Sequence, residues 1–379
     1  MHVLTLTPFY PTEHDDAKGC FVAEPLAALA KQGVSHTVVA AQPFYRPECP
    51  LSGAPPAELL RYFSLPGGVG LSSAGAFLFA RLVSRIRGVH RARKIDMIHA
   101  HAPLPCGQAA MLLSQELNVP YVVSVHGLDA YSTNQVHGRP GEWCRRVTQR
   151  VFRRAKRVIC VSEHVREEVL TGGGALRTSV AYNGVDAVVF SPSEEPSANG
   201  PSVLSIGNLI PIKGHETLIR AIAAVREYHP NLRLDIVGDG PEHERLIALT
   251  QQLDLNDRVL FLGRRSRHEV ARLQRSCTLF ALPSRFEGLG CVYLEAMSSG
   301  KVAIGCRGQG IEEVIRHGHN GWLVGPDNVD ELAAALTTLL ENSMLREYIG
   351  DQGRQTILSG FTLAHQAERL RRIYQECCA

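Results

Sequence analysis

The chain contains 379 residues, of which 45% are hydrophobic and 20% are charged, and its formal net charge is +3. This length is too great for one compact core, so the composition predicts a soluble globular protein of two domains. No apolar run is long enough to cross a bilayer, and the first residues lack a basic segment with a cleavage site, so we expect a cytoplasmic protein. Ten cysteines occur without a C-x-x-C pair, which argues against a zinc site or a disulfide framework.

Short apolar strands alternate with helical patterns along the whole chain. Continuous apolar runs are typical of buried parallel strands, and their alternation with helices indicates parallel sheets covered on both faces. The predicted strands are 2–7, 35–41, 96–102, 121–127, 157–162 and 178–183 in the first half, and 202–207, 232–238, 258–263, 277–283 and 301–306 in the second. The sequence therefore predicts an α/β protein with two doubly wound, Rossmann-like domains.

A segment rich in proline, serine and glutamate, residues 186–201, separates the two halves. This composition is typical of a linker between domains. We therefore place the first domain at 1–190 and the second at 191–359. A last helical pattern occupies 360–379.

Basic residues are concentrated in the first half, where residues 1–190 hold 20 lysines and arginines against 14 acidic residues. A helical pattern at 76–94 places Leu82 and Ile86 on one face and arginines around it. Such a helix either lies on an anionic membrane surface or covers the sheet with a basic outer face. A second basic cluster at 145–157 favours an anionic partner such as a lipid, with peripheral contact with an anionic membrane on the cytoplasmic side.

The loop after the predicted strand 277–283 indicates an anion site. Gly288 and Gly290 allow close approach to the backbone, and the helix that follows begins with unpaired N–H groups at the positive end of its dipole. Glu287 and Glu295 bracket the loop, and a carboxylate accepts hydrogen bonds from neighbouring hydroxyls. The pattern suits a ligand with phosphates between two polyols, such as a nucleotide sugar. The simpler alternative is that Glu287 and Glu295 are solvated residues near the start of a helix, where acidic residues are common and bind no ligand.

A lysine follows another strand in the second half. Lys213 comes after the strand 202–207 and a glycine turn, which places its ammonium at the carboxyl end of the sheet, where open α/β folds bind ligands. A flexible point charge suits a diphosphate. Taken alone, it would be an ordinary surface lysine.

Together, SVLSIGNLIPIKG (202–214) and FEGLGCVYLEAMSSG (286–300) resemble the C-terminal half of a retaining glycosyltransferase of family 4, which has the GT-B fold. The resemblance implies two Rossmann-like domains facing each other across a cleft, with 360–379 crossing back onto the first domain. It implies that Glu295 holds the ribose hydroxyls, that Glu287 contacts the donor sugar, and that Lys213 holds the diphosphate. Asn208 stands where the family usually has an arginine. The remaining implied donor-binding residues are Gly263, Arg264, Arg265, Gly288, Leu289, Gly290 and Cys291.

The first half supplies the implied acceptor side. SVHGLD (124–129) matches the family's HGxD segment, whose histidine, here His126, faces the donor sugar, with Asp129 beside it. His101 is a second, weaker candidate. Gly19, in the loop DDAKGCFV, resembles the family glycine that approaches the donor phosphate, although glycine in a polar loop more often only forms a turn.

These residues predict a retaining, metal-independent glycosyltransferase that uses a UDP- or GDP-sugar donor and an acceptor in polysaccharide, glycan or glycolipid assembly. His126, Lys213 and Glu287 are the expected catalytic residues. We expect no cofactor, because the nucleotide sugar is a substrate, and no nucleic-acid partner. A nucleotide-sugar epimerase of similar fold and a non-catalytic sugar-binding scaffold are the alternatives. A dinucleotide-dependent oxidoreductase is disfavoured, because no complete G-x-G-x-x-G follows the first strand.

Overall fold

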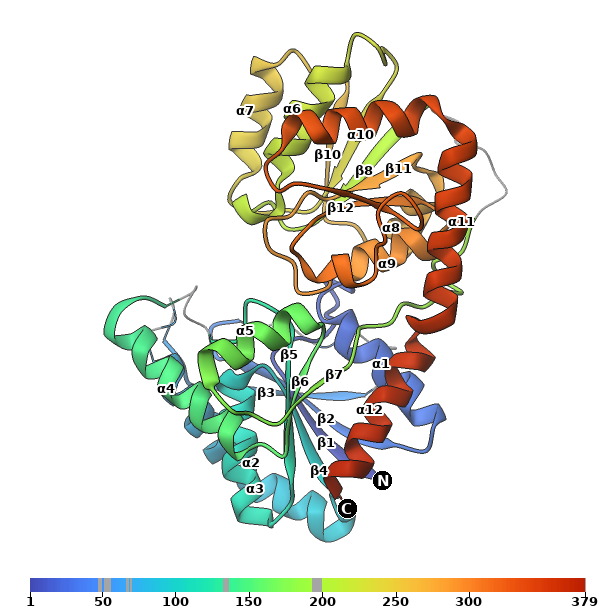
Figure 1. Ribbon diagram of the computed structural model, residues 1–379. Coiled ribbons are helices and arrows are strands. Elements are labelled where there is room, and N and C mark those ends of the chain that lie inside the picture. Colours follow the sequence, from blue (N-terminus) through green and yellow to red (C-terminus); the bar gives the residue numbers. More distant parts are fainter. Residues whose placement is uncertain are drawn as a thin grey trace. The chain divides into compact units, whose positions relative to one another are not determined.

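The computed structural model describes residues 1–46, 50, 56–65, 68, 70–131, 136–192 and 200–378. The chain divides into two compact units, and we describe each by itself (Figure 1). The first unit contains Met1–Asn183 and Leu363–Ala379, and the second contains Gly184–Thr362.

The first unit ends at Asn183, seven residues before the domain boundary that the sequence predicted at residue 190. Residues just after the division are tied to the second unit: the Val185 N–H donates to the Phe361 carbonyl at 2.9 Å, and Phe190 is fully buried. The Phe190 carbonyl accepts from Ser298 Oγ at 2.6 Å. Much of the predicted linker, 193–199, lies outside the described residues.

The first unit contains one parallel sheet in the order β3-β2-β1-β4-β5-β6-β7. The strands are β1 (His2–Thr7), β2 (Ser35–Pro43), β3 (Ala57–Tyr62), β4 (Met97–His101), β5 (Tyr121–Val125), β6 (Arg157–Cys160) and β7 (Thr178–Val180). Six of them were predicted. The edge strand β3 was missed because its sequence, AELLRY, contains two charged residues and is only partly buried.

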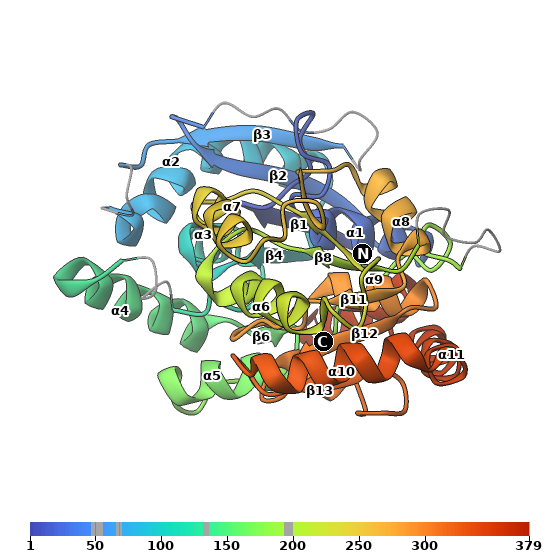
Figure 2. The same ribbon diagram turned by 90° about the horizontal axis from the view of Figure 1, so that it is seen from above.

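Helices cover both faces of this sheet. In Figures 1 and 2, α2, α3 and α4 pack together on one face, and α1 and α12 pack together on the other. The helices are α1 (Cys20–Lys31), α2 (Leu71–Ala92), α3 (Gln108–Leu117), α4 (Gly138–Arg154), α5 (Glu163–Gly173) and α12 (Leu363–Cys378), with a short helix η2 at Pro103–Gly107. The last predicted helix thus belongs to the first unit.

Of the two interpretations of residues 76–94, the structure supports a sheet-covering helix. The apolar side chains of Leu78, Leu82 and Ile86 in α2 are buried inside the unit. Two of the arginines are paired with acids of the same unit, Arg85 with Glu58 and Arg87 with Glu116. The apolar face of α2 is therefore not available to a membrane.

The second unit contains a parallel sheet in the order β10-β9-β8-β11-β12-β13. Its strands are β8 (Ser202–Ile206), β9 (Arg233–Val237), β10 (Val259–Gly263), β11 (Leu279–Ala281), β12 (Val302–Cys306) and β13 (Trp322–Val324). The prediction missed only β13, a three-residue edge strand. Two doubly wound sheets confirm the predicted fold class.

The helices of the second unit also lie on both faces, with α6 against α10 and α9 against α11. They are α6 (His215–Val225), α7 (His243–Gln252), α8 (Arg267–Ser276), α9 (Cys291–Ser298), α10 (Val329–Glu341) and α11 (Ser343–Gly360), with short helices η3 (Pro211–Lys213) and η4 (Gly310–Glu313). The neighbouring strands β8 and β11 bring the loops after 206 and after 281 to one edge of the sheet. Over the described part of the chain, every helix is too short or too polar to span a bilayer.

Candidate functional site

The loop between β11 and α9 is held in a conformation that requires glycine. Gly290 begins α9 with φ +79°, and a Cβ there would lie 2.5 Å from the Tyr293 ring. Glu287 is fixed on both sides, because its N–H donates to Gln309 Oε1 at 3.0 Å and its carbonyl accepts from the Gly310 N–H at 3.1 Å. The predicted residues Gly288, Leu289, Gly290 and Cys291 lie in this loop or at the first position of α9. The loop therefore presents the start of α9 at the carboxyl edge of the sheet.

An ion pair joins this loop to the loop after β8. Lys213 Nζ lies 2.5 Å from Glu287 Oε2, and the two side chains are only 18% and 14% exposed. The backbones also meet, because the Arg285 N–H donates to the Ile212 carbonyl at 2.8 Å. Gly214 has φ +73°, and a Cβ there would lie 2.0 Å from the Pro283 carbonyl oxygen. Two predicted residues 74 positions apart are thus brought into direct contact.

Glu295 is a buried carboxylate with one oxygen unoccupied. It is 2% exposed, and its Oε1 accepts from Arg267 Nη1. Its Oε2 has no hydrogen-bond partner among the described residues. The Arg267 guanidinium also lies over the Phe190 ring, 4.7 Å from its centroid, a cation–π contact. Arg267 thus neutralises the buried charge and leaves Oε2 able to accept a hydrogen bond from a ligand.

Arg267 was missed by the sequence analysis. The donor-binding residues implied after β10 end at Arg265, whereas Arg267 is the first residue of α8, after the N-cap Ser266. A cation at a helix start is unfavourable to the helix dipole. That local conflict was the available signal that its side chain serves a different purpose.

The other predicted donor residues lie at the same edge of the second sheet. Asn208 follows β8 and is exposed, and Arg264 and Arg265 are exposed after β10. Gly263 adopts φ +65°, and its carbonyl accepts from the Gly238 N–H at 3.0 Å. All the predicted donor-binding residues of this unit therefore lie at the carboxyl ends of β8, β10 and β11 or in the segments that follow them.

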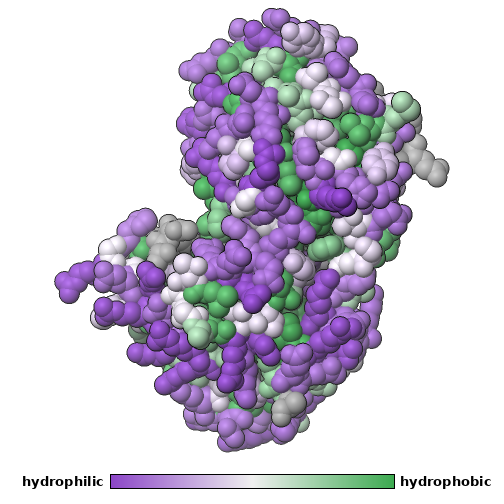
Figure 3. All heavy atoms as spheres, in the orientation of Figure 1, coloured by the Kyte–Doolittle hydropathy of each residue, from purple (hydrophilic) through white to green (hydrophobic). Residues whose placement is uncertain are grey.

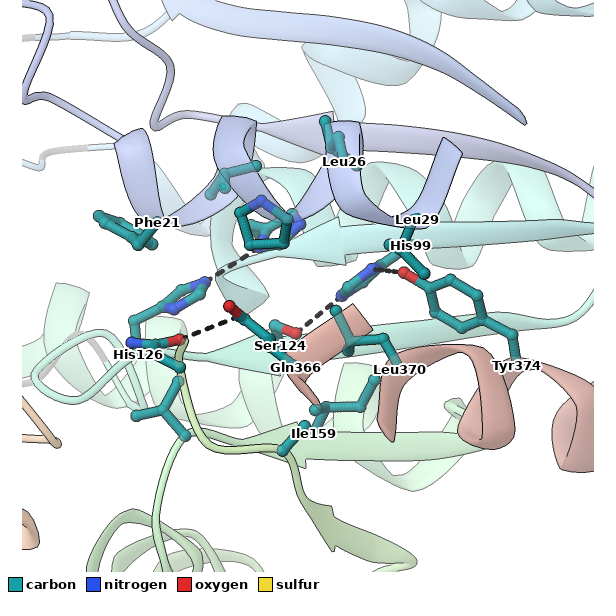
Figure 4. A pocket seen from close by; sticks show the side chains of 16 residues that line it. Phe21, Leu26, Leu29, His99, Ser124, His126, Ile159, Gln366, Leu370 and Tyr374 are labelled. Carbon is teal, nitrogen blue, oxygen red and sulfur yellow. Dashed lines mark hydrogen bonds between the residues drawn. The ribbon is translucent and has the colours of Figure 1, made fainter. Parts of the chain in front are cut away.

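In the first unit, three histidines, two from β4 and one directly after β5, form a stacked column, of which Figure 4 labels His99 and His126. His101 stacks on His99 with ring centroids 4.3 Å apart and on His126 with centroids 5.2 Å apart. His101 Nδ1 and His126 Nε2 share a hydrogen bond of 3.0 Å. The predicted pair His101 and His126 is thus in direct contact.

The third histidine links this column to the end of the chain. His99 Nδ1 shares a hydrogen bond of 2.7 Å with the Tyr374 hydroxyl of α12, and His99 Nε2 shares one of 2.7 Å with Ser124 Oγ. The column borders a small cavity of about 20 Å³, which is large enough for one water molecule. Tyr374 and Ser124 gave no signal in the sequence, because their contact depends on α12 folding onto β4.

Burial keeps the histidines neutral. It lowers the pKa of His126 to about 4 and that of His99 to about 3, and it lowers the pKa of His101 well below its usual value. At neutral pH each ring therefore carries one N–H donor and one acceptor. His126 can exchange a hydrogen bond with a hydroxyl but does not act as a cation.

Asp129 has a local structural role. Its Oδ1 accepts from the His126 N–H at 2.8 Å, which holds the turn after β5. Burial raises its pKa to about 6. The side chain therefore positions His126 through the backbone.

Gly19 lies in the loop that packs on His126. It adopts φ +69° before α1, and a Cβ there would lie 2.4 Å from the Tyr10 nitrogen. Phe9 and Phe21, on either side of this loop, place their rings 5.9 and 4.7 Å from the His126 ring. The first unit thus brings together Gly19, His101, His126 and Asp129. Within the described residues, no group of three or more potential ligands could hold a metal ion.

Two family models match the two halves of the chain. The model described as Glycosyltransferase Family 4 matches residues 21–189, and the model described as Glycosyl transferases group 1 matches residues 190–356. Among individual relatives, the putative teichuronic acid biosynthesis glycosyltransferase TuaC of Bacillus subtilis is 25% identical, and the match covers 99% of this chain and 98% of that protein.

Solved structures share the fold over nearly the whole chain. Sucrose-phosphate synthase from Thermosynechococcus elongatus matches with a TM-score of 0.82 and 22% identity over 99% of both chains. HepE from Anabaena, in complex with UDP and glucose, matches with a TM-score of 0.76 and 22% identity over 99% of this chain and 100% of that one. Both halves of the chain thus have counterparts among proteins of known architecture.

The Arg267→Ala variant should lose about 3 kcal/mol of unfolding free energy, because it leaves the buried Glu295 carboxylate without its counter-charge. Thermal or chemical unfolding measures the loss. The control Arg265→Ala removes an exposed arginine from the loop just before α8 and should leave the unfolding midpoint unchanged. Equal midpoints for the two variants would contradict the assigned role of Arg267.

The histidine column should make the protein less stable in mild acid. The folded-state pKa values lie below the usual value near 6.5, so the unfolded state binds more protons than the folded state below that pH. The stability that the neutral histidines contribute to the folded state is complete above about pH 6.5 and is lost as pH falls toward about 4. The free energy of unfolding then falls by up to about 1.4 kcal/mol per pH unit for each histidine.

Chemical unfolding of the wild type and His99→Gln measures this dependence. The variant should show a shallower loss of unfolding free energy between about pH 6.5 and about pH 4, because one of the titrating groups has been removed. The control His268→Gln, at an exposed histidine, should keep the wild-type slope. A His99→Gln slope equal to that of wild type would show that His99 is not held neutral.

Proposed function

The chain belongs to the family 4 glycosyltransferases and has the GT-B fold, and on that basis we propose the reaction, the donor and the acceptor class. The proposed reaction transfers a sugar from a nucleotide diphosphate sugar, with a UDP- or GDP-sugar as donor, to an acceptor hydroxyl with retention of configuration. The proposed setting is polysaccharide, glycan or glycolipid assembly.

The buried carboxylate of Glu295 carries this proposal. Its Oε2 lacks a partner among the described residues, while Arg267 holds its Oε1. A ribose offers the hydroxyl donors that such an oxygen needs, and leaving it unpaired is costly in the absence of a ligand. The UDP and glucose bound to HepE of Anabaena support a nucleotide-sugar donor of this kind.

Lys213 would stabilise the leaving diphosphate. Its ammonium has three donors, so it can keep its contact with Glu287 and still bind a phosphate oxygen. The N–H groups at the start of α9 lie in the adjoining loop and favour negative charge. Both groups oppose the charge that develops as the sugar leaves, which is electrostatic catalysis that needs no metal ion.

His126 and Glu287 would contact the donor sugar. His126 is neutral and shares a hydrogen bond with His101, so one side of its ring is already fixed in orientation. We assign no enzymic nucleophile. Retention would follow if the departing phosphate accepts the proton of the acceptor hydroxyl on the same face of the sugar.

An exposed aromatic cluster supports a sugar or lipid-linked acceptor. Phe44 follows β2 and Phe63 follows β3 at the carboxyl edge of the first sheet, and Phe77 lies on α2. The rings of Phe44 and Phe63 are parallel with centroids 5.7 Å apart, and Phe77 meets Phe63 at 5.4 Å. Each of the three is about half exposed. Aromatic faces of this kind pack against the apolar face of a sugar or against a lipid chain.

The Glu295→Ala variant should lose most of its nucleotide affinity, because the carboxylate that accepts the ribose hydroxyls is gone. His126→Ala should keep that affinity and lose turnover, since His126 contacts only the sugar. Calorimetric titration with UDP or GDP, together with turnover measured at saturating donor, separates the two effects. Equal loss of nucleotide affinity in both variants would refute the assignment.

The Phe63→Ala variant should raise KM for the acceptor about fivefold and leave KM for the donor unchanged, because one exposed aromatic contact contributes about 1 kcal/mol. Initial rates at varied acceptor and varied donor concentrations measure both constants. Tyr228→Ala, at an exposed aromatic residue of the second unit, is the control. A changed donor KM in Phe63→Ala would place the aromatic cluster outside the acceptor site.

A further inference from the structure

Helix α4 carries a continuous row of arginines on its solvent-exposed face. The buried face of α4 is formed by Cys144, Thr148, Val151 and Phe152, which pack inside the first unit. The opposite face is basic and continues into the turn after α4 and the segment before β7. We call this surface the α4 cationic face. It consists of Arg139, Arg146, Arg150, Arg153, Arg154, Lys156 and Arg177, all exposed.

These cations are not neutralised by the fold. Among the described residues, none of the seven takes part in an ion pair. The one acidic residue on α4 is Glu142. On helix α2, by contrast, two of the arginines, Arg85 and Arg87, are paired with Glu58 and Glu116. Seven exposed cations without an ion pair in the described part of the chain therefore lie on α4 and the segments next to it, where Figure 3 shows hydrophilic side chains gathered over the helix at the left of the unit.

The shape of the face suits an extended anionic partner rather than one small anion. Helix α4 has 17 residues and is about 25 Å long at the usual helical rise. At the C-terminal end of α4, a surface hollow of about 330 Å³ is lined by Arg153 and Arg154 of the helix and by Lys156 and Arg177 outside it. A single phosphate would reach only one part of this row, whereas a charged surface can contact all of it.

The exposed side chain of Trp143 indicates which kind of anionic surface the α4 cationic face contacts. Its side chain is 65% exposed, the most exposed aromatic side chain of the first unit among the described residues. At helical spacing it lies on the same side of α4 as Arg146 and Arg150. An indole is most stable at the boundary between water and an apolar layer, where its ring and its N–H find different surroundings.

We propose that the first unit docks on the surface of an anionic lipid bilayer through the α4 cationic face, with Trp143 entering the headgroup layer. The apolar face of α4 is buried in the fold, so the helix adsorbs by charge and one aromatic anchor and does not insert. Such binding is reversible and weakens as salt screens the charges. This surface shares no residue with the proposed donor and acceptor sites, so the inference stands apart from the proposed transfer reaction.

Co-sedimentation with vesicles tests the proposal. The wild type should bind vesicles in which about a third of the lipid is phosphatidylglycerol at about 0.1 M salt, and should bind weakly at about 1 M salt or to phosphatidylcholine alone. The variant R146Q/R150Q/R154Q should lose about two orders of magnitude in partitioning, since each arginine near an anionic surface contributes roughly one order or less. W143A should also weaken binding.

The matched control is R81Q/R85Q/R87Q, which removes three positive charges from α2. It should bind nearly as wild type, and all variants should keep the wild-type melting temperature and nucleotide affinity. Equal loss in both triple variants would show that only the net charge of the unit matters and would overturn the docking face. Wild-type binding to heparin but not to anionic vesicles would also overturn the proposal and assign the face to a soluble polyanion.

Discussion

The contact between Lys213 and Glu287 organises the second unit around its site. The pair joins the loops that follow the adjacent strands β8 and β11, and two close backbone contacts, at Gly214 and at Arg285, keep those loops together. A largely buried lysine and a largely buried glutamate would each be costly alone, and together they compensate each other. The result is a charged, preorganised edge of the sheet whose ammonium retains free donors for a phosphate ligand.

A related arrangement occurs in both units. In each, a protein partner fixes one side of a buried polar group, and the other side can bind a ligand. Arg267 occupies one oxygen of Glu295, and His101 occupies one nitrogen of His126. In each case the fixed contact removes orientational freedom before a ligand arrives, which lowers the entropic cost of binding. The supporting residues come from elements distant in sequence, α8 in the second unit and β4 and α12 in the first.

The sequence predicted what depends on local patterns. Eleven strands were identified from apolar runs, but β3 and β13 were too polar or too short to identify. Lys213, Glu287 and Glu295 were singled out by their loops after two strands together with the resemblance to the family, and His126 by the resemblance of SVHGLD (124–129) to a family segment. The partners of these residues could not be predicted, because Arg267, Tyr374 and Ser124 act through tertiary contacts that no spacing encodes. The basic segment 76–94 was ambiguous for the same reason: periodicity describes an apolar face but does not say whether a sheet covers it. The structure resolves this ambiguity, because Leu82 and Ile86 are buried inside the first unit.

The central claim is that the second unit binds a nucleotide diphosphate without a metal ion. Thermal unfolding in the presence of UDP, GDP or ADP and their common sugars, with and without EDTA, tests it most directly, because a ligand that binds only the folded state raises the melting temperature. The account predicts a clear increase with a uridine or guanosine diphosphate ligand that EDTA does not change. No increase with any of these ligands, an increase only with a dinucleotide, or an increase that EDTA abolishes would contradict it.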